Sequence, residues 1–340
     1  MVREVALLLA IVSFVSAATV PTIDWTRVRR VEELDHYWVR LPVEWEKAYR
    51  EVVPSPRITN GQEAIPGQFP YKALVLSEIG MLTTQCGGSI LTQNYILTAG
   101  HCVMFDQNNK VAGGTVIVGA HDRTVMEPTQ QRVRFASTGI HVHPQYSASN
   151  LRFDVAVIRV GTSIRFTASV QPVRLPGRAD QRQFDGFIGT VSGWGRTSDT
   201  EAIFPNTPHF TRNPILANAA CISTWGSLLV EAQNVCLSGE GGRAACNGDS
   251  GGPLTVEEGS GRTLQIGITS FGASGGCMRG QPTVYARITY FLDWIVANSD
   301  YITSARTDSA TTTTTTTSDG RTTDNADSVN VNANTGLGAS

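Results

Sequence analysis

The sequence predicts an all-β fold, a barrel or a sandwich, that ends in one helix. The chain has 340 residues, of which 33 are glycine and 15 are proline, a composition that favours turn-rich β structure. The stretch Tyr290–Ala297 predicts a terminal amphipathic helix, because its large apolar side chains recur at helical spacing. Short apolar or alternating runs separated by Gly, Asn and Pro predict the strands. These runs are Lys72–Leu76, Gly88–Leu91, Tyr95–Thr98, Thr115–Val118, Val155–Val160, Thr190–Ser192, Leu264–Ser270 and Thr283–Arg287.

The amino-terminal residues 1–17 are typical of a secretory signal peptide. Residues 5–15 are apolar apart from Ser13, Arg3 precedes them, and small residues follow at 16–18. The alternative, a membrane anchor, needs about 20 apolar residues, and this run is shorter. We therefore expect a secreted, extracellular protein with no membrane partner.

Two further segments flank the strand-rich region 58–299. Residues 18–57 hold three of the six tryptophans and no cysteine. They predict two short helices, Val31–Arg40 and Val43–Val53, followed by an extended, cleavable Pro-Ser-Pro-Arg linker. Residues 300–340 are rich in Thr, Ser, Asp and Asn, so they bury too little apolar surface to offset the entropy of ordering, and we expect disorder there.

Charge and cysteine content exclude several classes of protein. The net charge of −2 gives no basic surface for a nucleic-acid partner. An even number of cysteines in a secreted chain predicts three disulfides, although their spacing leaves the pairing open. A zinc site is the alternative, but no Cys-x-x-Cys pair occurs, so we expect no metal and no other cofactor. The six cysteines are Cys86, Cys102, Cys221, Cys236, Cys246 and Cys277.

Three local patterns carry groups capable of catalysis. His101 lies in Thr-Ala-Gly-His-Cys, Asp154 opens an apolar strand, and Ser250 lies in Gly-Asp-Ser-Gly-Gly-Pro. A single histidine is usually structural, and an aspartate before a strand is usually a turn residue. Glycines around one serine, however, suit a strained turn that presents a hydroxyl and bare amides. The order His, Asp, Ser is that of the chymotrypsin-type catalytic triad.

Residues 58–299 resemble the chymotrypsin/trypsin-like serine proteases over their full length. Further matching motifs are Ile58–Gly61, Gly67–Tyr71, Ser192–Gly195 and Val284–Arg287. Ser270–Gly272 and Tyr290–Ile295 are most similar to arthropod digestive chymotrypsins and brachyurins. The resemblance implies two six-stranded antiparallel β-barrels with a C-terminal helix. It also implies a serine endopeptidase made as a zymogen, with residues 18–57 as its activation propeptide.

The resemblance also implies the role of each site residue. Ser250 is the nucleophile, His101 is the general base and acid, and Asp154 orients the imidazole. The backbone N–H groups of Gly248 and Ser250 form the oxyanion hole. The alternative bases, which lack the flanking pattern, are His141 and His143.

Activation is expected to follow the family's route. A trypsin-like protease cuts between Arg57 and Ile58, and the new α-amine pairs with Asp249, which would otherwise be a costly buried charge. Without a cysteine in residues 18–57, the propeptide is expected to leave after the cut unless it binds non-covalently. The disulfides implied by the resemblance are Cys86–Cys102, Cys221–Cys236 and Cys246–Cys277.

The residues implied to line the specificity pocket favour large apolar side chains. Ala244 lies at the pocket floor, where it cannot pair with a substrate cation, and Gly272 leaves the entrance open. Thr283 replaces the family's glycine or the brachyurin aspartate, and Ser270 begins a backbone edge for an extended substrate. We expect cleavage after Phe, Tyr, Leu or Met. The alternatives are elastase-like or collagenase-like specificity, a limited-proteolysis enzyme of an extracellular cascade, and a catalytically dead binding homologue.

The expected partners follow from the same resemblance. They are protein and peptide substrates, the activating trypsin-like protease, and protein protease inhibitors. We expect the enzyme itself to be a monomer.

Overall fold

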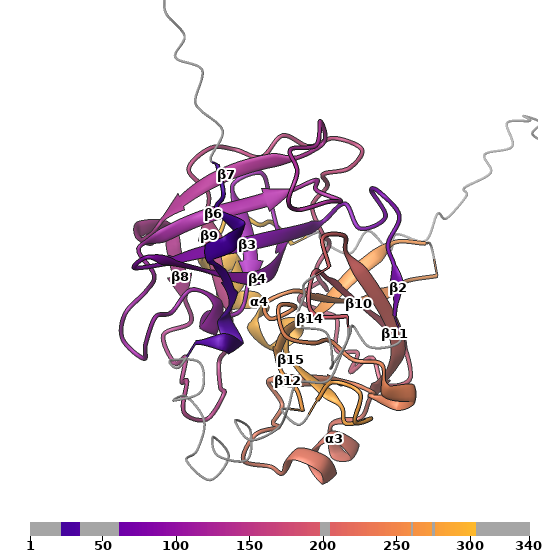
Figure 1. Ribbon diagram of the computed structural model, residues 1–340. Helices are drawn as coiled ribbons and strands as arrows, with labels where there is room; N and C mark the ends of the chain where they lie inside the picture. The colour runs from indigo at the N-terminus through magenta and orange to yellow at the C-terminus, as the bar shows by residue number, and fades with distance from the viewer. Residues whose placement is uncertain (1–21, 35–60, 198–204, 260, 274–275, 304–340) are drawn as a thin grey trace, which may run out of the picture. The chain divides into compact units, whose positions relative to one another are not determined.

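Figure 1 shows the computed structural model of the chain. The residues that it describes are 22–34, 61–197, 205–259, 261–273 and 276–303. The predicted signal peptide, the second predicted helix Val43–Val53 and the cleavage site at Arg57 and Ile58 lie outside the described residues.

The first sheet is built from strands that follow one another along the chain. Its order is β7-β6-β3-β4-β5-β9-β8. The two outermost strands, β7 and β8, are consecutive in the chain and are separated only by the short helix η4. The chain therefore passes directly from one outer strand of the sheet to the other. The bounds are β3 Lys72–Ile79, β4 Leu82–Ile90, β5 Tyr95–Thr98, β6 Gly113–Val118, β7 Gln131–Ala136, η4 Ser137–Gly139, β8 Ile140–Val142 and β9 Ala156–Arg159.

The second sheet closes on itself. Its order is β10-β13-β14-β15-β12-β11, and β11 pairs back with β10. The short strand β2, Gln62–Glu63, adds to β11, and the helix α3, Asn218–Trp225, precedes β12. The bounds are β10 Ile188–Gly193, β11 His209–Leu216, β12 Asn234–Leu237, β13 Pro253–Glu257, β14 Thr263–Phe271 and β15 Thr283–Arg287. The prediction of an all-β fold with two barrel-like sheets is confirmed.

The C-terminal helix α4, Ile288–Ala297, follows the last strand of the second sheet and packs against both sheets. Its buried residues Ile288, Phe291, Leu292 and Ile295 join the core cluster that contains β3, β5 and β9 side chains. The residues after it are held as well, since Asp300 accepts hydrogen bonds from Thr92 and Asn94. The segment predicted to be disordered is therefore anchored over its first described residues. No helix among the described residues has both the length and the apolar character that crossing a bilayer requires.

The described part of the predicted propeptide differs from the sequence prediction. It forms η1 (Trp25–Arg27), β1 (Val28–Arg30) and η2 (Val31–Glu33). The first predicted helix, Val31–Arg40, is wrong in its described part, because only one short 3₁₀ turn forms and Leu34 is extended. The reason is tertiary: β1 pairs in parallel with β4, so the segment follows the neighbouring strand instead of its own helical periodicity.

Truncating Phe291 to alanine is expected to lower the free energy of unfolding by about 3–5 kcal/mol, because the ring is buried in the first core cluster. Urea unfolding of the purified chain measures this change. Asp293→Ala, on the exposed face of the same helix, is the control, and its exposed ion pair with Arg178 contributes at most about 1 kcal/mol. Equal losses from both variants would contradict the packing described for α4.

Candidate active site

Two neighbouring strands bring His101 and Asp154 together. His101 lies in the short helix η3 (Gly100–Cys102), directly after β5, and Asp154 lies two residues before β9. The strands β5 and β9 pair antiparallel, with Thr98 opposite Ala156, so the end of one meets the start of the other. His101 and Asp154 therefore lie at the same end of this strand pair.

His101 and Asp154 are joined twice and are both buried. Asp154 Oδ2 lies 2.8 Å from His101 Nδ1, and Oδ1 accepts a hydrogen bond of 3.0 Å from the His101 backbone N–H. The Ser270 hydroxyl also donates to Oδ2 at 2.6 Å. Because a carboxylate can only accept, this arrangement puts the proton on Nδ1 and leaves Nε2 as the basic nitrogen.

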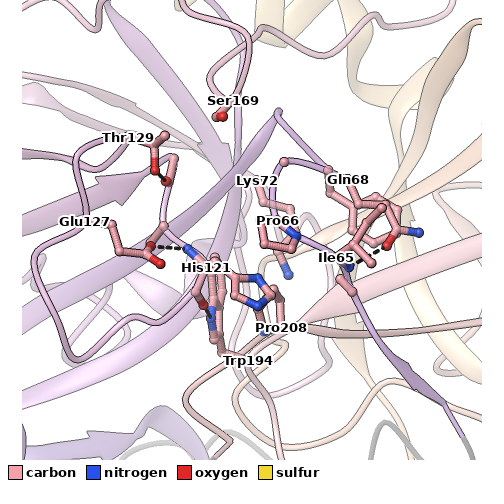
Figure 2. Close-up of a pocket in the computed structure, with 15 residues that line it drawn as sticks. Ile65, Pro66, Gln68, Lys72, His121, Glu127, Thr129, Ser169, Trp194 and Pro208 are labelled. Atoms are coloured by element: carbon pink, nitrogen blue, oxygen red, sulfur yellow. Dashed lines mark hydrogen bonds between the residues drawn. The ribbon is translucent and has the colours of Figure 1, made fainter.

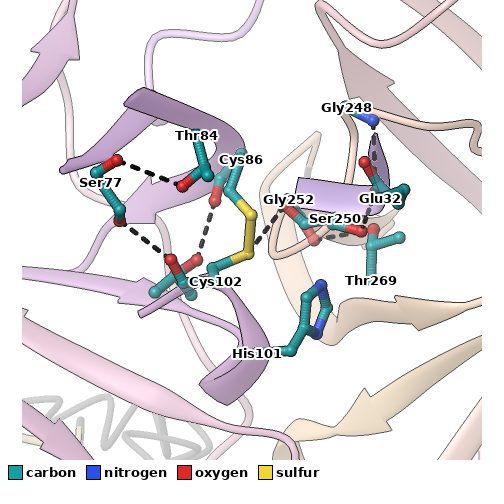
Figure 3. The surroundings of a disulfide bond; sticks show 12 residues. Glu32, Ser77, Thr84, Cys86, His101, Cys102, Gly248, Ser250, Gly252 and Thr269 are labelled. Atoms are coloured by element: carbon teal, nitrogen blue, oxygen red, sulfur yellow. Dashed lines mark hydrogen bonds between the residues drawn. A yellow bond between two sulfur atoms is a disulfide. The ribbon is translucent and has the colours of Figure 1, made fainter. Parts of the chain in front are cut away.

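Ser250 lies in a turn that is held by both sheets. The turn follows Cys246 and leads into β13; the Gly87 N–H of β4 donates to the Ser250 carbonyl at 2.7 Å. Gly248 and Gly251 within the turn have φ angles of 94° and 78°, which side-chain-bearing residues rarely adopt. Cys102, next to His101, brings its sulfur within 3.5 Å of the Ser250 carbonyl oxygen, so the serine turn and the histidine turn are in contact (Figure 3).

Glu32, which the sequence analysis did not single out, contacts the side chain of Ser250. Glu32 of the segment 22–34 accepts a hydrogen bond from Ser250 Oγ at 2.5 Å and one from the Gly248 N–H at 3.3 Å, both through Oε1 (Figure 3). No sequence pattern marks Glu32, because the contact depends on how two distant segments dock.

Asp249, beside Ser250, is fully buried in a space that glycines leave free. Its carboxylate accepts hydrogen bonds from the Gly195 N–H at 2.9 Å and the Cys246 N–H at 3.0 Å. A Cβ atom on Gly193 would lie 1.6 Å from Oδ1, so only glycine fits there. Burial raises the pKa of Asp249 and lowers the pKa of Lys72, and the opposite charges of the two groups partly offset both shifts.

Of the residues predicted to line the specificity pocket, Ser270 and Thr283 lie in strands of the second sheet, and Gly272 and Ala244 lie in loops. Gly272 follows β14 and Thr283 begins β15, and a Cβ on Gly272 would lie 3.8 Å from the Thr283 side chain. Ser270 and Ala244 are both buried, Ala244 just before Cys246. Gly272 and Thr283 are thus brought together, whereas no described contact joins Ala244 to either of them.

Three disulfides cross-link the described residues: Cys86–Cys102, Cys221–Cys236 and Cys246–Cys277. These are the pairs that the family resemblance implied. The first joins β4 to the turn that carries His101. His101 and the two sulfurs of this bond are close enough for a metal, but the disulfide removes both thiolates, so the group provides only one ligand (Figure 3).

The alternative histidines lie in other surroundings. His143 stacks on Phe153 with ring centroids 4.9 Å apart and also packs against Phe291 and Trp294. Burial lowers the pKa of its imidazole. His141 pairs with Val157 in the first sheet. These contacts give both residues structural roles.

A separate cavity of about 120 Å³ opens between the start of β3 and the loop after β6 (Figure 2). Ile65, Lys72, His121, Glu127 and Trp194 are among its lining residues, and the Lys72 Nζ lies 4.3 Å from the centre of the Trp194 ring. Lys72 connects this cavity to the surroundings of Ser250, because its charge acts on Asp249; none of the lining residues belongs to the predicted specificity pocket.

The chain matches known proteins over the strand-rich region. The Trypsin family model matches residues 58–295. A chymotrypsin of Phaedon cochleariae is 36% identical over 254 residues, covering 74% of this chain and 85% of its own. A brachyurin of Leptuca pugilator is 37% identical over 241 residues, covering 70% of this chain and 96% of its own. The solved structure of HL collagenase matches with a TM-score of 0.62 and 30% identity, covering 71% of this chain and 97% of that one. The chain therefore belongs to the trypsin family of serine endopeptidases.

Proposed function

We propose that the chain is a secreted serine endopeptidase, made as a zymogen, that cleaves peptide bonds through Ser250, His101 and Asp154. The observation that carries the proposal is the buried His101–Asp154 pair at 2.8 Å, held by the Cys86–Cys102 disulfide against the turn of Ser250. The apolar run and small residues of the predicted signal peptide 1–17 support secretion.

The chemistry runs in two steps. Ser250 Oγ attacks the carbonyl carbon of the substrate while His101 Nε2 takes its proton, and the oxyanion accepts hydrogen bonds from the N–H groups of Gly248 and Ser250. His101 then gives the proton to the leaving amine, the C–N bond breaks, and an acyl-enzyme remains. A water molecule, deprotonated by His101, attacks the ester, and the acid product leaves with Ser250 Oγ protonated again. Asp154 stabilises the imidazolium in both steps.

Activation is proposed to depend on Asp249. Its carboxylate is fully buried, and burial raises its pKa although the charge of Lys72 opposes this, so a further cation nearby would stabilise the ionised form. A cut between Arg57 and Ile58 would supply that cation as the new α-amine. The Pro-Arg-Ile-Thr sequence at this junction supports cleavage by a trypsin-like protease.

The proposed specificity is chymotrypsin-like. The buried Ala244 has no charge to offer, and Gly272 carries no side chain over Thr283. A substrate Lys or Arg would bury its cation without a partner, which costs several kcal/mol. Elastase-like cleavage after smaller residues is the second candidate, because the side chain of Thr283 takes more space than the family's usual glycine.

The test is to cut the purified chain with immobilised trypsin, remove the trypsin and profile cleavage across a peptide library. We expect cleavage after Phe, Tyr, Leu or Met to exceed cleavage after Arg or Lys by at least about 100-fold. A serine-directed phosphonylating inhibitor should abolish it. The variant Arg57→Gln, carried through the same steps, controls for residual trypsin and should stay uncut and inactive. Efficient cleavage after Arg or Lys would refute the specificity, and activity of uncut Arg57→Gln equal to that of the cut chain would refute the zymogen.

A further inference from the structure

The outer edge of β4 is shared by three different partners. β3 pairs along one side of β4, whereas on the other side β5 reaches only Ser89 and Ile90. The Gly87 N–H on this side bonds to the Ser250 carbonyl. The remaining residues, 83–85, pair in parallel with β1. The amino-terminal segment thus fills an open strand edge directly beside the serine turn (indigo in Figure 1).

Apolar side chains fix this segment at both ends of β1. Val28 is buried in a cluster with Leu74, Leu76, Ile117 and Trp194. Val31 is buried in the main core cluster of the first sheet. Before the strand, Trp25 packs against the Val28 cluster, and the Arg123 guanidinium lies 4.8 Å from the centre of its ring. Burial of this kind is typical of a specific docked peptide and not of a loose linker.

The pairing of β1 with β4 places one acidic side chain, that of Glu32, against Ser250. β1 ends at Arg30, opposite Gln85, and the turn η2 that follows brings Glu32 to the Ser250 turn. The next residue, Glu33, is neutralised within the segment by an ion pair with Arg30. Glu32 is 6% exposed, and its Oε1 accepts from both Ser250 Oγ and the Gly248 N–H.

The Glu32 carboxylate places a negative charge where the proposed oxyanion of the reaction would lie. Its carboxylate oxygen accepts from the Gly248 amide, one of the two donors assigned to the oxyanion. It also accepts a hydrogen bond from the Ser250 hydroxyl. That hydroxyl has a single proton, so it then cannot donate to the basic nitrogen of His101. At this point Ser250 faces a side-chain carboxylate and not a peptide bond. Because a carboxylate has no amine leaving group, Ser250 cannot cleave the segment there.

From these contacts we propose that the active-site face carries a docking site for the segment 22–34 of this same chain, and that the excised propeptide is a reversible peptide inhibitor of the enzyme that acts through the carboxylate of Glu32. The proposal rests on the proposed function, because it assigns Ser250 and Gly248 as the blocked groups. All the contacts are non-covalent and all lie amino-terminal to Arg57, so the cut at Arg57 leaves them in place. The propeptide is therefore expected to stay bound after activation, until dilution releases it.

The decisive experiment compares three full-length chains cut at Arg57 without separation of the propeptide: wild type, Glu32→Gln and Asp24→Asn. Peptidase activity is assayed immediately and again after serial dilution. For the wild type, activity per molecule should rise with dilution and with time as the propeptide leaves. Glu32→Gln removes the charge from the hydrogen bonds to Ser250 and Gly248, and should weaken inhibition by about 10- to 100-fold. Asp24→Asn, whose exposed side chain touches neither residue and keeps an oxygen for the Thr26 N–H, should behave like the wild type.

A synthetic peptide of residues 22–34 gives the complementary measurement on mature enzyme freed of its propeptide. The peptide should inhibit competitively and slow phosphonylation of Ser250, and the Glu32→Gln peptide should do both about 10- to 100-fold less well. An active enzyme that the peptide does not inhibit, or inhibits equally well with Glu32→Gln, would overturn this proposal and leave the proposed function intact. If no cut form hydrolyses peptides at any dilution, the proposed function itself fails.

Discussion

Ser250→Ala is expected to lower the kcat of the cut enzyme by about 10⁴- to 10⁶-fold, and His101→Ala by a similar factor. In the proposed mechanism the serine supplies the nucleophile and the histidine supplies its activation, so either loss removes the same covalent route. The double variant should therefore be no slower than the single ones. Steady-state kinetics on a peptide substrate, with the variants purified free of wild-type enzyme, measure all three values.

His141→Gln is the control for this series. His141 pairs with Val157 within the first sheet and makes no described contact with Ser250, so its replacement should change kcat by less than about threefold. Loss of activity in His141→Gln with activity retained in His101→Ala would show that the wrong histidine has been assigned. Additive losses in the double variant would show that Ser250 and His101 do not act in one step.

Much of the fold was predictable because the interior of each sheet selects apolar residues. Tyr95–Thr98 and Thr283–Arg287 were predicted as strands with the bounds that the structure gives them. The predicted helix Tyr290–Ala297 begins two residues earlier, at Ile288. The helix α3 was missed. Its eight residues, Asn218–Trp225, bury only Cys221 and Trp225, so they leave a weak helical pattern in the sequence.

The amino-terminal segment shows where sequence patterns lose their predictive power. The spacing of its apolar residues fits a helix, yet Val28 and Val31 are buried in two different clusters that flank a parallel strand. The pairing partner, β4, lies some fifty residues further along, and nothing local encodes a contact of that range. Glu32 was missed for the same reason, since its position depends on the register of β1 against β4.

The central site residues were easier to predict, because strained turns need particular residues. The glycines around Ser250 take positive φ angles, and the glycines at 193 and 195 leave space for the Asp249 carboxylate. The glycines at 248 and 251 lie next to Ser250 in the chain, so one short motif contains them, whereas those at 193 and 195 belong to the separate motif Ser192–Gly195. The part played by Ser270 towards Asp154 is different, because it joins residues from the two sheets and has no motif of its own.

Asp154→Asn is expected to lower kcat by about 10⁴-fold while the protein stays folded. An asparagine keeps an oxygen for the His101 backbone N–H, which now donates to Oδ1 at 3.0 Å. In place of Oδ2 it presents an NH₂ group to His101 Nδ1, so Nδ1 becomes the acceptor and the proton moves to Nε2. The imidazole then lacks the basic nitrogen that Ser250 needs. Steady-state kcat, together with the melting temperature of the variant, separates this effect from unfolding.

Ser270→Ala tests the same carboxylate from its other side. It removes the 2.6 Å hydrogen bond to Oδ2 but leaves the charge and the His101 contact, so we expect a loss in kcat of only about 10-fold with little change in KM. The order of the two kcat losses matters more than either value. Ser270 only positions Asp154, so its loss must cost less than the loss of the carboxylate that fixes the tautomer of His101. If Asp154→Asn and Ser270→Ala lose kcat equally, Asp154 acts as one structural hydrogen bond among several, and His101 owes its basicity to another group.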